Sequence, residues 1–301
     1  MGRLTAIVLG SAAGGGYPQW NCLCPVCRLA WEGDRRVKPR GQASLAVSAD
    51  DAQWTLLNAA PDLRAQIAAV PALHPRGVSR TSPISAVVLT GAEVDQTAGL
   101  LNLRERQPFT LHGTAETLGI LADNSMFDVL ASDVVSREAV ALERPFALSG
   151  GMMATLFAVP GKLPLYLEGE NVDVSAEGET NVGVEITAGG RRLAFVPGCA
   201  EVRPALRERL AKADVVLFDA TLFTDDEMIA TGTGAKTGRR MGHMPVDGPS
   251  GTLAALSDLP GRRVLIHINN TNPILIDGSP ERRKVEAAGW QVAEDGMEIV
   301  L

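Results

Sequence analysis

Three of the four cysteines in this chain lie within six residues, in the segment Cys22-Leu-Cys24-Pro-Val-Cys27. Thiolates at this spacing can bind one tetrahedral Zn²⁺ together, with a fourth ligand from a distant part of the chain. We therefore predict an N-terminal zinc knuckle at about residues 14–32. Three buried free thiols are the alternative, and a disulfide is the weaker interpretation of an odd cluster. Candidates for the fourth zinc ligand are His243, His267 and Asn270.

Short apolar runs alternate with polar turns along the rest of the chain. Many short strands with a few interspersed helices favour sheets covered by helices. The helices are too few for a doubly wound parallel sheet, and no Pro/Ser-rich boundary divides the chain. We therefore expect one α/β domain over residues 1–301. The clearest predicted strands are residues 4–9, 84–89, 215–218 and 264–268, and the clearest helices are residues 62–70, 97–104, 204–212 and 282–288.

The composition argues against several classes of partner. The chain has 28 basic and 35 acidic residues and a net charge of −7, whereas nucleic acids and anionic membranes are bound by basic surfaces. No apolar run reaches the roughly 18 residues of a membrane-spanning helix, and the first ten residues lack the features of a signal peptide. We expect a cytoplasmic protein that binds neither nucleic acid nor membrane. Without a glycine-rich nucleotide-binding motif, no nucleotide cofactor is expected.

Polar residues follow three of the apolar strands. Asp95 lies in the loop behind the strand at residues 84–89, where it can bind a metal or cap the next helix. Glu93 in the same loop is expected to be solvated. Asp219 ends the strand VVLF, and a carboxylate there either caps a turn or lines a site, because burial without hydrogen bonds is costly. His267 precedes the polar run at residues 269–272, which favours a metal-binding role.

The few remaining histidines limit the chemistry. The chain has four in all, and His243, between Gly242 and Met244, is a candidate for binding substrate or moving a proton. Asp95, His267 and one more oxygen or nitrogen donor would resemble the two-His-one-carboxylate site of non-haem iron oxygenases, with one histidine fewer. Cys199 is expected to be a buried thiol.

The loop at residues 90–100 resembles the T-H-x-H-x-D-H-x-x-G signature of the metallo-β-lactamase superfamily. In that alignment Gly91, Glu93 and Gln96 stand at histidine positions and Asp95 is kept. The cysteine cluster resembles the zinc knuckle of the phosphodiesterase branch. Residues 195–200 resemble the superfamily's Gly-Asp-Thr strand end, and residues 242–243 resemble its late Gly-His. Residues 264–267 resemble its final strand, which carries a metal-binding histidine.

A narrower resemblance covers nearly the whole chain. The segments GGGYPQWNCLCPVC, AEVDQTAGLLNLRE, VPGK, LFDATLFTDDEM, GHMP and HINNTNPIL are similar to those of the pyrroloquinoline quinone (PQQ) biosynthesis protein B family. This resemblance implies an αββα sandwich of two mixed sheets and a step in PQQ biosynthesis. The favoured step is iron- and O₂-dependent hydroxylation of a tyrosine ring in a Glu-Tyr-derived precursor. A carrier of PQQ or its precursor is the first alternative. A metal-dependent hydrolase is the second, and the shortage of histidines disfavours it.

The hydroxylase interpretation assigns a role to each candidate residue. Asp95 and His267 would hold Fe²⁺, and His243 would assist. Other proteins of the PQQ pathway are expected partners. Members of the family usually carry a histidine where this chain has Gln96, so we expect weak iron binding here, because an amide oxygen is a poorer donor than imidazole. The cations expected to bind carboxylates of a polyacidic substrate are Lys162, Arg239 and Arg240.

Overall fold

The computed structural model describes residues 3–169 and 173–301. Its first sheet has seven strands in the order β14-β1-β2-β3-β4-β5-β6. The neighbours from β14 to β3 are antiparallel, and those from β3 to β6 are parallel. The strands are β1 (Thr5–Gly10), β2 (Ser44–Ser48), β3 (Trp54–Leu57), β4 (Ile84–Val88), β5 (Phe109–Gly113), β6 (Val135–Ala139) and β14 (Glu298–Val300).

The second sheet also has seven strands, in the order β13-β12-β11-β10-β9-β8-β7. Here β10 to β13 are parallel neighbours, and β7 to β10 are antiparallel neighbours. Both sheets are therefore mixed, as expected. The strands are β7 (Phe146–Ala147), β8 (Met153–Ala158), β9 (Val182–Ala188), β10 (Arg191–Val196), β11 (Val215–Asp219), β12 (Arg262–Ile266) and β13 (Gln291–Val292).

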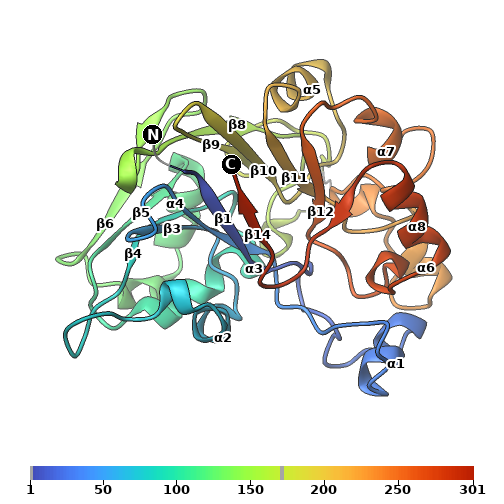
Figure 1. Cartoon of the computed structure of the whole chain (residues 1–301), viewed down its shortest axis with the longest axis horizontal. Coiled ribbons are helices and arrows are strands. Elements are labelled where there is room, and N and C mark those ends of the chain that lie inside the picture. The colour runs from blue at the N-terminus through green and yellow to red at the C-terminus, as the bar shows by residue number, and fades with distance from the viewer. Residues whose placement is uncertain (1–2, 170–172) are drawn as a thin grey trace.

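Helices cover the outer face of each sheet (Figure 1). Apolar side chains between the sheets, such as Leu45 and Phe195, form one core cluster. A second cluster joins the outer face of the first sheet to α2, and a third joins the second sheet to α5 and α8. These layers confirm the predicted αββα sandwich. The helices are α1 (Pro25–Trp31), α2 (Leu63–Ala69), α3 (Val94–Thr97), α4 (Ala115–Ala122), α5 (Pro204–Leu210), α6 (Glu227–Ala230), α7 (Thr252–Ala255) and α8 (Pro280–Ala287).

The helix predicted at residues 97–104 is wrong in its start and its type. Helix α3 begins at Val94, and a 3₁₀ helix, Ala98–Leu103, continues it. The α-helical pattern breaks because the Gly99 N–H donates to the Ala59 carbonyl instead of to the carbonyl four residues earlier. A side chain at Gly99 would also collide with the backbone of residues 59–60.

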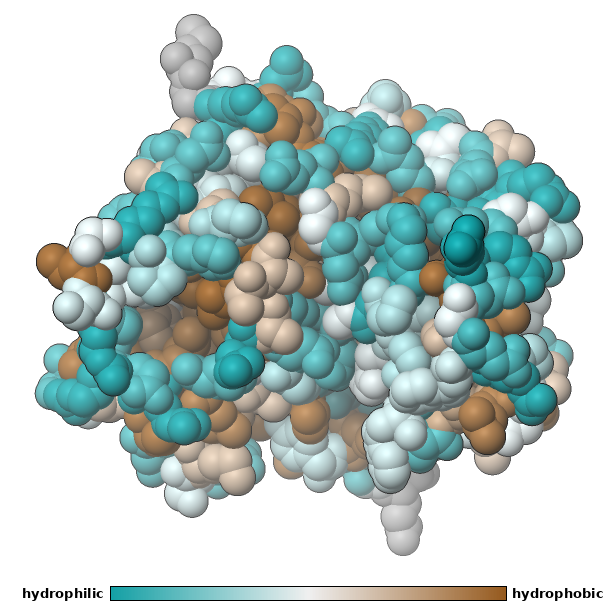
Figure 2. All heavy atoms as spheres, turned by 60° about the horizontal axis from the view of Figure 1, so that its bottom comes forward, coloured by the Kyte–Doolittle hydropathy of each residue, from teal (hydrophilic) through white to brown (hydrophobic). Residues whose placement is uncertain are grey.

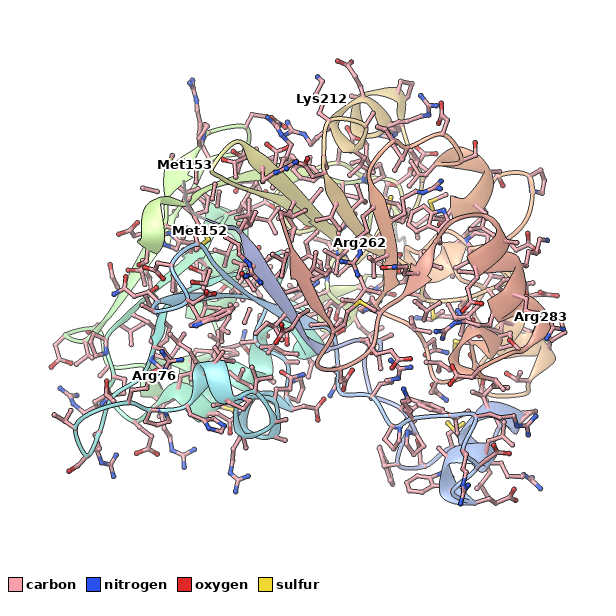
Figure 3. The ribbon with its side chains drawn as sticks, viewed as in Figure 1. Arg76, Met152, Met153, Lys212, Arg262 and Arg283 are labelled. Atoms are coloured by element: carbon pink, nitrogen blue, oxygen red, sulfur yellow. The ribbon has the colours of Figure 1, made fainter. Side chains whose placement is uncertain are left out.

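Polar side chains cover most of the molecular surface. Figure 2 shows a largely hydrophilic face with smaller apolar patches. Exposed cations such as Arg76, Lys212 and Arg283 lie at the periphery (Figure 3). The adjacent residues Met152 and Met153 differ in exposure: Met152 is buried and Met153 is 38% exposed. Within residues 3–169 and 173–301, none of the helices has both the length and the apolar character needed to cross a bilayer.

Candidate metal centres

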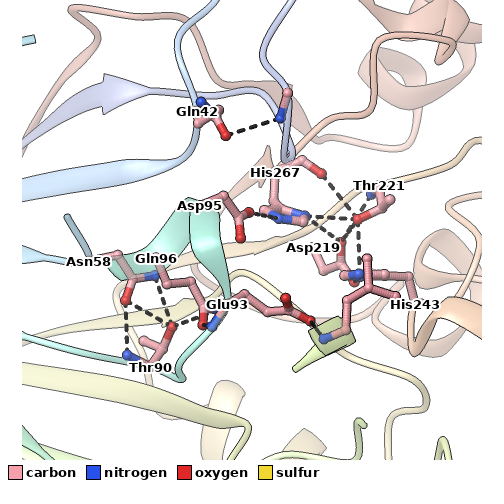
Figure 4. A network of polar contacts seen from close by, with 12 residues as sticks. Gln42, Asn58, Thr90, Glu93, Asp95, Gln96, Asp219, Thr221, His243 and His267 are labelled. Carbon is pink, nitrogen blue, oxygen red and sulfur yellow. Dashed lines mark hydrogen bonds and ion pairs between the residues drawn. The ribbon is translucent and has the colours of Figure 1, made fainter. Parts of the chain in front are cut away.

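The carboxyl ends of strands from both sheets meet at one point. Asp219 is the last residue of β11, and His267 directly follows β12, its parallel neighbour. Asp95 lies in the first turn of α3, behind β4 of the other sheet. Because parallel strands end at the same edge, these three residues lie together although they are far apart in sequence (Figure 4).

Asp219 is fully buried and hydrogen-bonded on both carboxylate oxygens. One oxygen accepts from the Cys199 N–H at 3.0 Å and pairs with His243 Nδ1 at 2.6 Å. The other accepts from the Thr221 N–H at 3.0 Å and from the Thr221 hydroxyl group at 2.7 Å. These contacts offset the cost of burying the charge. The Asp219 carboxylate therefore caps the turn at Thr221 and also holds His243.

His267 bridges the two carboxylates. Its Nε2 lies 3.0 Å from Asp95 Oδ2, and its Nδ1 lies 2.9 Å from the Thr221 hydroxyl oxygen. The His267 backbone has a φ of 59°, an unusual left-handed conformation, and β12 ends two residues earlier than predicted. His243 stacks on His267 with ring centroids 5.2 Å apart. The chain therefore tolerates a strained residue at the centre of this network.

The site is electrostatically coupled. Burial lowers the pKa of His267, but hydrogen bonds and charge from Asp219 and Asp95 outweigh it and raise this pKa to about 10. Burial raises the pKa of Asp219, but His243 and His267 hold it well below its usual range. For Asp95, burial is again outweighed by the hydrogen bond and charge of His267, which lower its pKa. Both carboxylates are therefore ionised at neutral pH, as metal ligands must be.

The donor set fits a divalent transition metal. Ligand atoms of Asp219, His243 and His267 all lie within 4.8 Å of one another, and Asp95 contacts His267. Two imidazoles and a carboxylate are the donors of non-haem iron sites. Asp95, His243 and His267 are the residues predicted from the sequence, whereas Asp219 is not among the predicted ligands. A carboxylate ending a buried strand, followed by Thr221, was the signal for it.

Two residues of the signature loop serve the start of α3 instead. Gln96 is buried, and its Oε1 accepts from the N–H of Glu93, the N-cap residue, at 3.1 Å. Glu93 is only partly solvated, contrary to expectation. Its carboxylate accepts from Lys162 Nζ at 3.2 Å and from the Leu165 N–H at 3.0 Å. Since Glu93 is the N-cap of α3, Asp95 has no capping role that would account for its position.

A cavity of about 380 Å³ opens beside this centre. Asp95, His243 and His267 line it, as does Lys162. The other two predicted substrate cations differ from each other in placement. Arg240 lies 3.6 Å from Glu168, which also lines the cavity, whereas the Arg239 guanidinium donates to the Ser250 hydroxyl oxygen at 2.7 Å. Lys162 therefore lines the cavity, Arg240 lies next to a lining residue, and Arg239 contacts Ser250.

The three knuckle cysteines form the second candidate centre. Their sulfur atoms lie within 4.8 Å of one another, at the start of α1. The Asn270 side-chain nitrogen lies 3.2 Å from both Cys22 Sγ and Cys27 Sγ. A hydrogen bond from the Cys24 thiol lowers the pKa of Cys27. Three thiols beside one polar side chain fit a tetrahedral Zn²⁺, with the amide oxygen of Asn270 as the fourth donor once the amide is turned.

Cys199 lies apart from the knuckle cysteines. It is fully buried, its Sγ donates to the Glu201 carbonyl at 3.1 Å, and burial raises its pKa. These contacts agree with the expected buried thiol.

Comparisons with known proteins match this fold. The model of the beta-lactamase superfamily domain matches residues 53–268. Coenzyme PQQ synthesis protein B of Methylobacterium nodulans is 57% identical over 99% of this chain and 100% of its own length. The protein of the same name from Ruegeria pomeroyi is 53% identical over 98% and 99% of the two chains.

Two solved structures extend the comparison. Zn²⁺-bound PqqB from Methylobacterium extorquens has a TM-score of 0.97 and 55% identity, covering 99% of this chain and 100% of its own. A diphosphatase of the PhnP family has a TM-score of 0.70 and 21% identity, covering 99% and 97%, and so shares the fold alone. The chain therefore belongs to the PQQ synthesis protein B family, within the beta-lactamase superfamily.

Proposed function

We propose that this chain hydroxylates the tyrosine ring of a Glu-Tyr-derived precursor in PQQ biosynthesis, using Fe²⁺ and O₂. Relatives that are 53–57% identical over nearly the full chain support a role in that pathway. The observation that carries the proposal is the joining of Asp219, His243, His267 and Asp95 at a cavity large enough for a small peptide.

Asp95, Asp219 and His267 would hold the iron, with His243 at the fourth position or beside the substrate. Bound Fe²⁺ would supply activation of O₂. Replacing one ring C–H bond by C–OH consumes O₂, two electrons and two protons, and releases water. An external two-electron reductant must supply the electrons. His243, held by Asp219 and lining the cavity, is the residue placed to move a proton.

Zinc has a separate role in this proposal. Cys22, Cys24 and Cys27 would bind a structural Zn²⁺, with Asn270 as the fourth ligand. The Zn²⁺-bound relative supports the presence of zinc. Asn270 lies three residues after His267, so the knuckle would brace the segment that follows the iron ligand.

Aerobic and anaerobic incubation of the iron-loaded protein with Glu-Tyr peptide and a reductant tests the proposal. A product heavier by one oxygen atom, formed only with O₂ and labelled by ¹⁸O₂, is expected. Tight binding of the peptide or of PQQ without turnover would instead support the carrier alternative. Cleavage of the peptide bond without O₂ would support the hydrolase.

Gln96→His is expected to raise the affinity for Fe²⁺ by about tenfold or more, because imidazole is a better donor to iron than an amide. The same substitution removes the acceptor for the Glu93 N–H, which should cost about 1 kcal/mol of unfolding free energy. Iron titration and thermal unfolding measure the two effects. Gln66→His, at a buried glutamine that contacts Ser44 and Gln42, is the matched control. Equal iron affinity in the parent chain, Gln96→His and Gln66→His would show that residue 96 does not reach the metal.

A further inference from the structure

A buried carboxylate lies among three cations at the edge of the substrate cavity. Glu168 Oε1 is 2.6 Å from Lys162 Nζ, and its Oε2 is 3.5 Å from Lys236 Nζ. The Arg240 guanidinium is 3.6 Å from the same Oε2. Only 9% of the Glu168 side chain is exposed. Such a convergence exceeds what a surface ion pair needs and is the arrangement by which proteins bind a carboxylate ligand.

The location ties this cluster to the proposed iron centre. Lys162, Lys236 and Glu168 all line the cavity that contains His243 and His267. The Lys162 side chain packs against Gly242, the residue before His243: a Cβ at Gly242 would lie 3.1 Å from Lys162 Cγ. Lys162 and Lys236 therefore hold a carboxylate on the wall of the same cavity that the two histidines line.

The surroundings also allow Glu168 to leave. Lys162 and Glu168 also border a second cavity of about 330 Å³, which gives the displaced carboxylate room. Lys162 keeps a second partner, because Glu93 Oε1 lies 3.2 Å from its Nζ. With Glu168 displaced, Lys162 would still face Glu93, whereas Lys236 and Arg240 would be left to face the ligand carboxylate. Burial alone would raise the pKa of Glu168, but Lys162, Lys236 and Arg240 lower it, so the group competes as an anion.

We propose that Glu168 occupies the subsite in which Lys162, Lys236 and Arg240 bind a carboxylate of the substrate. Substrate binding then requires displacement of Glu168, which acts as a competitor built into the chain. The inference rests on the proposed function for the nature of the ligand, a Glu-Tyr-type acid. It adds Lys236 and Glu168 to the residues that determine affinity, in place of Arg239.

Binding of the Glu-Tyr dipeptide to iron-free protein, measured by calorimetry, tests this inference without turnover. Glu168→Gln keeps the side-chain shape and removes the competing charge, so it should bind the dipeptide about tenfold tighter than the parent chain. Glu177→Gln is the matched control, because Glu177 pairs with Arg203 and does not line the cavity. It makes the same change in net charge and should leave affinity unchanged.

Two further measurements identify the group that is recognised. Adding Lys162→Gln or Lys236→Gln to the Glu168→Gln variant should remove the gain in affinity. Gln-Tyr amide, which lacks both carboxylates, should bind the parent chain and Glu168→Gln equally. Dipeptide affinity in Glu168→Gln equal to or below that of the parent, with an unchanged melting temperature, would overturn the inference. So would a gain that persists with Gln-Tyr amide.

The outcome is independent of the catalytic proposal. Hydroxylation by the iron-loaded parent chain, together with no gain in the Glu168→Gln variant, would keep the proposed function and reject the internal competitor. Tighter binding by Glu168→Gln without any hydroxylation would support the carboxylate subsite and favour the carrier.

Discussion

His267→Ala is expected to abolish detectable hydroxylation and to lower Fe²⁺ affinity by at least about 100-fold. The reason is its position, because its imidazole joins Asp95 of α3, behind the first sheet, to Asp219 and Thr221 at the end of β11 in the second sheet. Without it, the buried carboxylate of Asp219 and the partly buried carboxylate of Asp95 would have no imidazole between them. Asp95→Ala and Asp219→Ala should each have a comparable effect on iron. The double variant Asp95→Ala/His267→Ala should be little worse than either single one, because the ligands act as a unit.

Iron titration of the purified protein measures this loss directly, apart from activity. His74→Ala is the matched control: His74 is partly exposed, contacts the Ala68 carbonyl and lies outside the cavity. Zinc content should stay unchanged in every variant, because no knuckle cysteine is altered. If His267→Ala bound iron as tightly as the parent chain, His267 would not be a metal ligand. Parent-level hydroxylation by Asp95→Ala would do the same for Asp95 and move the balance toward the carrier.

The apolar strands at the centre of the fold are the part of the structure that sequence patterns predict best. β4 and β11 are nearly continuous apolar runs because both of their faces are buried, and β12 becomes apolar and buried from Val264 onward. β6 escaped prediction because, as an outer strand, it buries only one of its five residues. Residues 94–103 were assigned wrongly because backbone contacts with Ala59 decide the helix type there. Those contacts join segments distant in sequence, which local periodicity cannot represent.

The site divides in the same way. Asp95 and His267 could be predicted because each follows an apolar strand with a polar run behind it. The proximity of these two residues to Asp219 could not be predicted from the sequence, because it depends on the pairing of β11 with β12 and on the packing of the two sheets. Arg239 and Arg240 are indistinguishable in sequence, yet one faces Ser250 and the other Glu168. Glu168 itself carries no local signal, since its importance lies in three cations from elsewhere in the chain.

Cys24→Ser is expected to lower the unfolding free energy by roughly 3 kcal/mol or more, and the melting temperature by roughly 5 °C. The sulfur of Cys24 is buried at the N-cap of α1, where it accepts from the Cys27 N–H at 3.4 Å. A serine oxygen would keep the cap but replace a thiolate ligand by a poor zinc donor. Zinc should fall from about one per chain to a trace.

Thermal unfolding with and without a chelator separates the zinc effect from the loss of a thiol. Chelation should bring the parent melting temperature down to that of Cys24→Ser and leave the variant unchanged. Cys199→Ser, a buried cysteine outside the knuckle, should keep its zinc and respond to the chelator like the parent. A zinc-free parent chain with full stability would contradict the prediction.

Iron binding should respond less than stability does. The knuckle contacts the chain at Asn270, whereas His267 is held separately by Asp95 and Thr221. Thr271 donates a hydrogen bond from its hydroxyl group to the Glu227 carboxyl group, independently of the knuckle. Burial raises the pKa of Glu227 to about 7. These contacts remain when zinc is lost. Well below its melting temperature, Cys24→Ser should therefore bind Fe²⁺ within about threefold of the parent. A collapse of iron affinity in the still-folded variant would instead mean that the zinc knuckle positions the iron ligands.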